Sequence, residues 1–153
     1  MKERDADEVE FGLLLGFAFG FSHDHLDTLH ALAGEDWHTR HEDVIAALDE
    51  LLKMKAPVSA EVLYRAALSK YAYRDYDEAE ALGVKCIWAL GHLRTREAVL
   101  RLGDLLASGN EILESNAAKQ LRRIAAAVED VPASAKALAT ELLAAHPGGS
   151  MTG

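Results

Sequence analysis

The stretch VKCIWALGHLRTREAVLRLGDLL, residues 84–106, decides the fold. It consists of two apolar runs joined by the polar tetrapeptide RTRE, residues 94–97. The apolar residues of each run recur every three or four positions, which is the spacing of one face of an α-helix. Thr95 stands where the second helix would begin, and threonine is a favoured N-cap. The stretch therefore predicts two helices and a short turn, with apolar faces formed by Leu82, Cys86, Ala89, Leu90 and Leu93, and by Ala98, Val99, Leu102, Leu105 and Leu106.

The rest of the chain carries the same helical signals. It has no sustained alternation of apolar and polar residues and no Asn-Gly or Asp-Gly hairpin turn. We expect helices over about 7–21, 26–33, 44–52, 60–69, 82–93, 96–106, 112–124 and 133–143. The proposed starts are capping boxes at Thr39 with Glu42 and at Asp77 with Glu80, single caps at Ser59, Thr95 and Asn110, and Pro132 before the last helix.

These helices also repeat imperfectly. LDELL at 48–52 and LGDLL at 102–106 stand in similar helices 54 positions apart. Cys86, Leu90 and Leu93 correspond to Ala117, Leu121 and Ile124 at an offset of 31. Helix pairs repeated in this way are typical of a solenoid, in which each pair buries its apolar face against its neighbours.

The pattern in 84–106, an ALG-x-L helix end, a polar turn and an EAV-x-x-L-x-x-LL helix, resembles a HEAT repeat. It is most similar to the HEAT-like type first named for phycobiliprotein lyases. The resemblance covers 84–126 well and 39–70 loosely, and 1–38 match no family. It implies an all-α, HEAT-like α-solenoid of about three helix pairs over residues 39–146, behind an N-terminal helical cap at 1–38. Residues 1–146 would form one domain, and 147–153 a flexible tail.

Composition narrows the classes of function. With 153 residues, half of them hydrophobic, the chain is long enough for one domain with a substantial core. The uncharged run FGLLLGFAFGF, 11–21, follows an acidic leader and is shorter than a bilayer span, so we expect a buried helix in a cytoplasmic protein rather than a signal peptide or membrane helix. Cys86 is the only cysteine and is expected in the core.

Negative charge is concentrated near the N-terminal end. Residues 21–50 contain eight carboxylates and one arginine, and so carry −7 of the net charge of −9. Such a field repels phosphate backbones and attracts basic partners. We therefore expect no binding to nucleic acid, although an acidic face that serves solubility alone is an equally good reading of the charge.

Tyrosine and tryptophan in two polar connections are the candidate partner-binding residues. KYAYRDYDEAE, 70–80, alternates tyrosines with carboxylates, and tyrosine dominates binding hot spots. The alternative is that these tyrosines tuck beneath the loop and hold the repeats together. Trp37, between helices, would either plug the core or anchor a partner, whereas Trp88 is expected to be half-buried in repeat packing. The candidate surface comprises Asp36, Trp37, Glu42, Asp43, Tyr71, Tyr73, Asp75, Tyr76, Asp77 and Glu78.

Catalytic and metal-binding patterns are weak by comparison. Five of the seven histidines lie within 23–41, but Ile45 occupies the place of the second histidine of a zinc-protease HExxH. Without a cysteine pair to complete a structural zinc site, we expect these histidines to be hydrogen-bonded at helix ends, with no metal or other cofactor. No G-x-S-x-G sequence or glycine-rich phosphate loop is present, so we expect a protein that is not an enzyme.

A small, acidic HEAT-like protein without catalytic motifs resembles the immunity proteins of bacterial polymorphic-toxin systems. That resemblance implies a protein that binds and occludes a basic toxin domain, with a nuclease the toxin class best suited to the charge. A scaffold or chaperone-like binding protein is the alternative. A HEAT-like DNA glycosylase is a further one, disfavoured by the net charge because such enzymes need a basic groove.

Overall fold

The computed structural model describes residues 5–71, 73, 80–128 and 131–146, and over these residues it consists of α-helices and one 3-10 turn, without strands. The prediction of an all-α fold is confirmed. The elements in chain order are α1 (Ala6–Phe19), η1 (His23–His25), α2 (Leu26–Ala33), α3 (His41–Lys53), α4 (Ala60–Leu68), α5 (Ala81–Leu93), α6 (Arg96–Leu106), α7 (Glu111–Ala126) and α8 (Ala133–Ala145).

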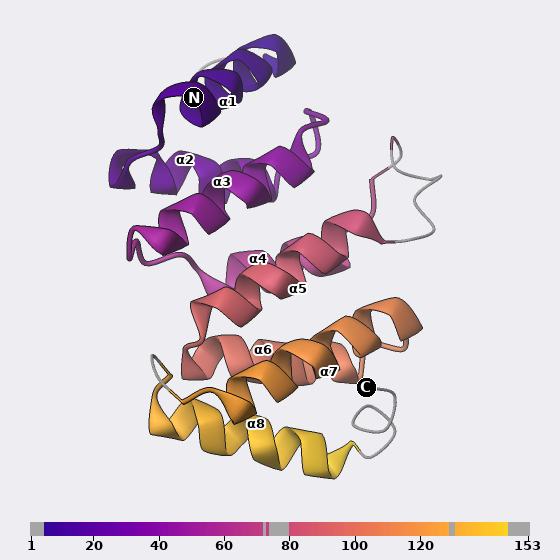
Figure 1. Ribbon diagram of the computed structural model, residues 1–153. Helices are drawn as coiled ribbons and strands as arrows, with labels where there is room; N and C mark the ends of the chain where they lie inside the picture. The colour runs from indigo at the N-terminus through magenta and orange to yellow at the C-terminus, as the bar shows by residue number, and fades with distance from the viewer. Residues whose placement is uncertain (1–4, 72, 74–79, 129–130, 147–153) are drawn as a thin grey trace.

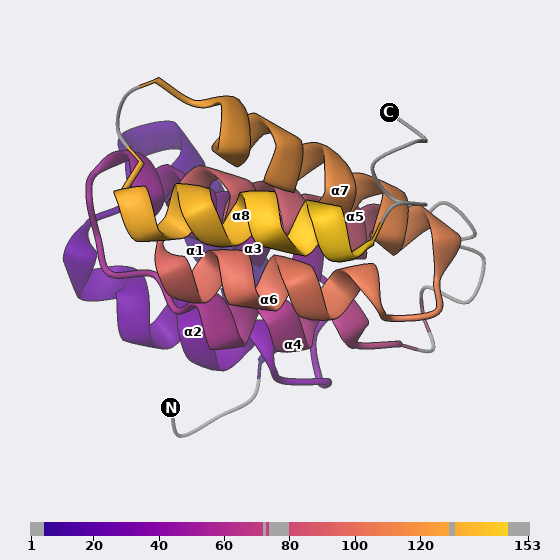
Figure 2. The ribbon, with the colours of Figure 1, turned by 90° about the horizontal axis from the view of Figure 1, so that it is seen from below.

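The helices form two stacked layers, as an α-solenoid does (Figure 1). In one layer α1 packs on α3, α3 on α5 and α5 on α7. In the other, α2 packs on α4, α4 on α6 and α6 on α8. Figure 2 views the stack from below, with α8 nearest the viewer. The helices α1 and α2 thus continue the two layers that the predicted repeats form. The stack has α1 at one end and α8 at the other (Figure 1).

The core lies between the layers and follows the predicted apolar faces. Leu82, Cys86, Leu90, Leu102 and Leu105 are almost completely buried. The same holds for the matching residues of α3 and α7, among them Leu48, Leu51, Leu121 and Ile124. Burial of an apolar side chain of this size contributes about 1.5–3 kcal/mol, so the repeated faces contribute strongly to stability.

Three glycines that are not part of the predicted apolar faces allow neighbouring helices to approach closely. A Cβ added at Gly83 of α5 would lie 2.6 Å from Leu113 Cδ2 and 3.1 Å from the carbonyl oxygen of Ala67. At Gly91 it would collide with the buried side chain of Gln120, and at Gly103 it would lie 2.8 Å from Leu142 Cδ1. These positions bring α5 against α4 and α7, and α6 against α8.

The three single caps proposed at helix starts are confirmed by their hydrogen bonds. The backbone N–H of Val62 donates to Ser59 Oγ, and that of Ala98 to Thr95 Oγ1. Asn110 Oδ1 accepts from the N–H groups of both Ile112 and Leu113. Pro132 stands directly before α8, as expected.

The capping box proposed at Thr39 and Glu42 is wrong. Helix α3 begins at His41, its N-cap is Arg40, and no side chain caps it. Instead, a histidine from the preceding loop holds this end, because the Arg40 N–H donates to His38 Nδ1 at 3.1 Å. At α5 the N-cap is Glu80, whose own side chain makes no capping hydrogen bond, and the proposed partner Asp77 lies outside the described residues.

The prediction that 11–21 form a buried helix is also wrong. Helix α1 ends at Phe19, and only Val9, Leu13 and Gly16 are buried. The reason is its position at the end of the stack, where only one side of the helix has neighbours (Figure 1). Across the part of the chain that the structure describes, no helix has the length and apolar character needed to span a membrane.

Candidate functional site

Two candidate regions far apart in the sequence meet in one aromatic stack, made of Trp37, His38, His41, Tyr71 and Tyr73. The His41 ring stacks on His38 at a centroid distance of 4.1 Å and on Tyr71 at 3.8 Å. Tyr73 lies parallel to His41 at 5.7 Å, and Trp37 meets His38 edge-on at 5.4 Å. The loop before α3 and the connection after α4 are therefore joined through the buried N-terminal residue of α3.

Hydrogen bonds fix the two histidines of the stack. His38 Nε2 donates to the Leu32 carbonyl at 2.7 Å while its Nδ1 accepts from the Arg40 N–H, an arrangement that uses the neutral ring. His41 Nε2 donates to the Glu35 carbonyl at 2.6 Å, and its Nδ1 lies 2.6 Å from the Tyr73 hydroxyl. Both histidines are buried and use both ring nitrogens, so they organise the loop as hydrogen-bonded residues at a helix end.

The two tyrosines of the stack pack against the protein, which was the alternative to partner binding in the sequence analysis. Tyr71 is partly buried against the core, its hydroxyl lies 3.4 Å from the Ala33 carbonyl, and burial raises the pKa of its phenol. Tyr73 is half-buried as well. The remaining candidates of this connection, Asp75, Tyr76, Asp77 and Glu78, lie outside the described residues.

Trp37 is partly buried and packs against the core. Its indole N–H is buried, and no acceptor lies within hydrogen-bond distance among the described residues. The neighbouring Asp36 is exposed. Of the two roles proposed for Trp37, plugging the core is the one that its burial supports.

The outer face of α3 carries a row of carboxylates that includes two of the predicted site residues. Glu42 and Asp43 lie in the first turn of α3, and Asp49 and Glu50 follow seven positions later, so all four lie on one side of the helix. Arg40 lies 3.8 Å from Asp43, and His92 Nδ1 lies 2.9 Å from Asp49 Oδ1. All four side chains keep some exposure to solvent.

Trp88 of α5 stands beside this acidic row and was not among the predicted site residues. Its side chain remains 38% exposed, and its indole N–H lies 3.4 Å from Asn116 Oδ1. The guanidinium of Arg123 sits over the ring at 5.3 Å from its centroid, a cation–π contact. Contacts with α7 on two sides thus hold a large aromatic ring at the surface.

Hollows lie on both sides of Trp88. One of about 400 Å³ is lined by residues of α3 and α5, among them Asp49, Glu50 and Lys85, and by Phe17 of α1. The other, of about 390 Å³, is lined by Lys119, Arg122 and Arg123 of α7. We name the surface formed by Glu42, Asp43, Asp49, Glu50, Lys85 and Trp88 the α3–α5 face; its acidic side is α3, and the basic side chains of α7 border it.

The remaining histidines of the cluster and the cysteine have structural roles. His23 Nε2 lies 3.0 Å from the Met54 carbonyl, and His30 Nε2 accepts from the Ser59 N–H at 3.0 Å. Within the described ranges, no group of three or more histidine, cysteine or carboxylate side chains could hold a metal ion. Cys86 is fully buried, and burial raises the pKa of its thiol, so this cysteine is a core residue as predicted.

Neither protein-family models, nor curated proteins, nor solved structures match this chain. The function must therefore be inferred from the surface of this molecule.

The α3–α5 face could have been found only in part from the sequence. The acidic residues of α3 were visible as a charge cluster, and two of them were included among the candidates. Trp88 lies next to the apolar stripe of its helix, which indicates packing; its exposure and its acidic neighbours come from the stacking of α3 on α5.

Proposed function

We propose that this protein is a non-enzymatic protein-binding module, and that it is an immunity protein that binds and occludes a cognate bacterial toxin. The observation that carries the proposal is the α3–α5 face, where the exposed Trp88 shares a hollow with Asp49 and Glu50, and Glu42 and Asp43 extend the acidic row along α3. Solenoids bind partners through such arrays, because stacked helices hold side chains at fixed spacings on an extended surface.

Trp88 is the proposed anchor. Tryptophan is enriched among the residues that dominate binding free energy, and an anchor that is already ordered loses little conformational entropy on binding. Asn116 and Arg123 provide that order by contacting the ring before any partner arrives. The hollows beside the ring can accept side chains from a partner, which favours a protein ligand over a flat, weak contact.

The charge of the face indicates a basic partner. Glu42, Asp43, Asp49 and Glu50 form a negative row, and Asp36 adds an exposed carboxylate in the loop before α3. An opposite charge on a toxin would accelerate association and orient the complex. The basic residues of α7 at the other side of Trp88 would disfavour the reversed orientation.

The immunity role follows from this charge together with the resemblance described above. A toxin that acts on nucleic acid has a basic cleft, and an acidic face that covers this cleft would block its substrate. The proposal places both proteins in the cytoplasm and includes no nucleic-acid or membrane partner. Tyr71 and Tyr73 hold the connection after α4, while Asp75, Tyr76, Asp77 and Glu78 belong to the proposed surface on sequence grounds alone.

The test uses the product of a neighbouring gene that encodes a toxin domain, with binding kinetics measured on purified proteins. Trp88→Ala is compared with Leu100→Ala, since Leu100 is 41% exposed but lies on α6 in the other layer. Loss of an anchor typically costs about 2 kcal/mol, so we expect dissociation to become roughly 30-fold faster for Trp88→Ala alone.

A second pair of variants tests the charge. Asp49→Asn combined with Glu50→Gln should slow association, most clearly at low salt, whereas Glu97→Gln combined with Asp104→Asn on α6 should not. If a tight complex forms and all four proteins bind like wild type, the α3–α5 face is not the binding site. If no neighbouring toxin domain binds, the immunity role is refuted.

A further inference from the structure

Helix α1 presents a second helix-packing stripe that no part of the described chain covers. Its inner stripe, Val9, Leu13 and Gly16, is buried against the stack. On the opposite side, Phe11, Leu14, Leu15 and Ala18 follow the spacing i, i+3, i+4, i+7, and all four are exposed. Phe11 is 61% exposed and Leu14 64%. A helix with apolar residues on both sides is typical of the interior of a stack, yet α1 is at its end (Figure 1).

Helix α8, at the opposite end of the stack, exposes different side chains from α1. The exposed residues of α8 are Ser134, Lys136, Thr140, Glu141 and four alanines, with no large apolar side chain among them, which comes close to the polar outer face that a terminal solenoid helix needs. The N-terminal end has no such face. The asymmetry between the two ends indicates that the α1 end is covered in the working protein and the α8 end is not.

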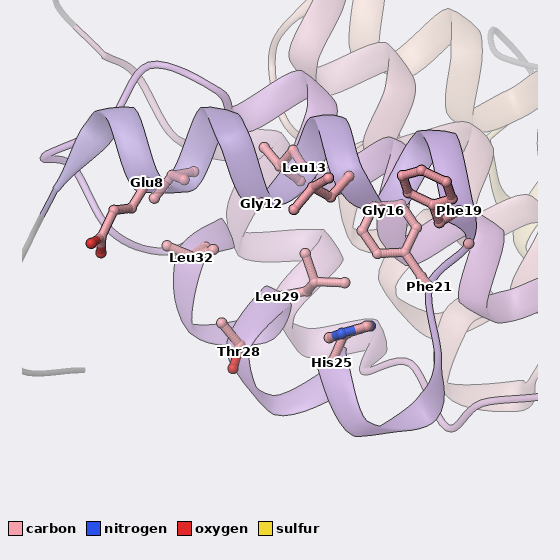
Figure 3. Close-up of a pocket in the computed structure, with 13 residues that line it drawn as sticks. Glu8, Gly12, Leu13, Gly16, Phe19, Phe21, His25, Thr28, Leu29 and Leu32 are labelled. Carbon is pink, nitrogen blue, oxygen red and sulfur yellow. The ribbon is translucent and has the colours of Figure 1, made fainter.

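A groove next to the stripe makes this end self-complementary. It has a volume of about 560 Å³ and lies between α1 and α2, with Gly12, Leu15 and Phe19 on one side and Leu29 and Leu32 on the other. Figure 3 shows Gly12 and Phe19 of α1 and Leu29 and Leu32 of α2 around the space, with the Phe21 ring against Gly16. A two-fold interface requires both projecting and receiving features on one patch, and α1 supplies projecting phenyl and leucyl groups beside a receiving groove.

The exposed apolar area matches what a dimer of ordinary size requires. Phe19 is 85% exposed, and Leu15 is 41% exposed. Together with Phe11 and Leu14, these side chains expose roughly 500 Å², which is within the range of the largest patch on a typical monomer. A standard interface buries about 800 Å² per partner, so the apolar surface of α1 supplies most of one such interface.

From these observations we propose that two copies of this chain associate through α1, with the two α1 helices antiparallel. Pairing through this end covers both apolar ends and leaves the polar α8 ends outermost, so the assembly closes at two copies. The antiparallel orientation follows from charge: the acidic first turn, Asp7 and Glu8, would meet its copy in a parallel pair and is kept apart in an antiparallel one. From Phe11 to Phe19 the helix has no charged residue to bury.

The first experiment measures mass in solution by sedimentation and light scattering over a range of protein concentrations. We expect the mass to rise from 16.6 kDa towards twice that value. Leu14→Glu should weaken association by about tenfold or more, because it brings unpaired carboxylates into the interface. Phe11→Gln should act in the same direction, while Leu100→Glu, an exposed leucine outside the stripe, should leave association unchanged.

Salt separates this association from the proposed toxin complex. Acidic residues such as Asp7, Glu8 and Asp27 surround the dimer interface in both copies, so added salt should strengthen the dimer by screening their repulsion. Salt should weaken a complex between the acidic α3–α5 face and a basic toxin. Failure of either proposal is thus visible without reference to the other.

Cross-linking tests the orientation. Since Cys86 is buried, an introduced cysteine is the thiol that can react. The midpoint of the stripe falls between Leu14 and Leu15, so Leu14→Cys should form a disulfide between copies. In an antiparallel pair two cysteines at position 18 would be offset by about 10 Å along the helix axis, beyond the roughly 7 Å that a disulfide spans. Ala18→Cys should therefore remain reduced.

Four results would overturn the proposal. The first is a monomer at every soluble concentration, and the second is a dimer that Leu14→Glu and Phe11→Gln do not weaken. The third is a disulfide at position 18 as readily as at position 14, which would indicate a parallel pair. The last is a monomer whose Leu14→Glu variant loses a toxin partner, which would assign the α1 face to that partner instead.

Discussion

Substitution of Gly83 by alanine tests the close helix packing at the centre of the stack. In an exposed helix the change from glycine to alanine stabilises by about 1 kcal/mol. At Gly83 the added methyl carbon would lie 2.6 Å from Leu113 Cδ2 and 3.1 Å from the Ala67 carbonyl oxygen. Leu113 is itself buried, and the carbonyl belongs to the backbone of α4, so neither neighbour can move away freely.

The two effects oppose each other, and their sizes decide the sign. Overpacking a filled core costs about 1–3 kcal/mol, which exceeds the helix-propensity gain of about 1 kcal/mol. We expect Gly83→Ala to lower the free energy of unfolding by about 1 kcal/mol. For a domain of this size, that corresponds to a fall in Tm of about 2–4 °C.

Gly12→Ala provides the matched control. The same substitution in α1 would place the methyl group where nothing lies within 4 Å. It should therefore keep the propensity gain and raise Tm by about 2–4 °C. Urea denaturation gives both free energies, at a protein concentration low enough to keep the chain monomeric because Gly12 lines the groove of the proposed dimer. A Gly83→Ala protein as stable as Gly12→Ala would refute the close approach of α5 to α4 and α7.

Four further outcomes are expected. Gly16→Leu should destabilise the protein on thermal unfolding, because its side chain would occupy the place of the Phe21 ring; a neutral effect would contradict the packing at Gly16. Asn110→Ala should lower the free energy of unfolding by about 1 kcal/mol in urea titrations through loss of the α7 cap, and an unchanged value would count against that cap. Cys86 should resist a thiol reagent under native conditions and react after denaturation, since burial raises its pKa; rapid native reaction would disprove its burial. Burial lowers the pKa of His30 below its ordinary value of 6.5, so near that pH the unfolded chain binds more protons than the folded chain. The stability that depends on neutral His30 is therefore present above pH about 6.5 and is lost as the pH falls. When the free energy of unfolding is measured across this pH range, the loss should be absent in His30→Gln.

Many helix boundaries were predictable because their causes are local. The apolar spacing of residues 84–106 and the caps at Ser59, Thr95 and Asn110 involve residues within four positions of one another. The prediction of a capping box at Thr39 and Glu42 was wrong because a contact that is not local determines this helix start. Its competitor is the His38 ring, fixed by a hydrogen bond to the Leu32 carbonyl that a capping pattern does not include.

The candidate site was only partly predictable because its components are far apart in the chain. The acidic residues near Asp43 and the tyrosines near Tyr73 were each visible in the sequence, but the hydrogen bond between His41 and Tyr73 joins residues 32 positions apart. That contact makes the tyrosines part of the packing. The exposure of Trp88 between an acidic and a basic surface likewise depends on how α3, α5 and α7 stack.

The sequence by itself determined that this protein is a stack of helices, because periodicity and capping act over one or two helical turns. Only the tertiary structure decided which apolar faces have neighbours. The run 11–21 has the composition of a buried helix, yet α1 lies at the end of the stack and leaves Phe11 and Leu14 exposed. Composition records how apolar a helix is; the number of helices that contact it depends on its place in the fold.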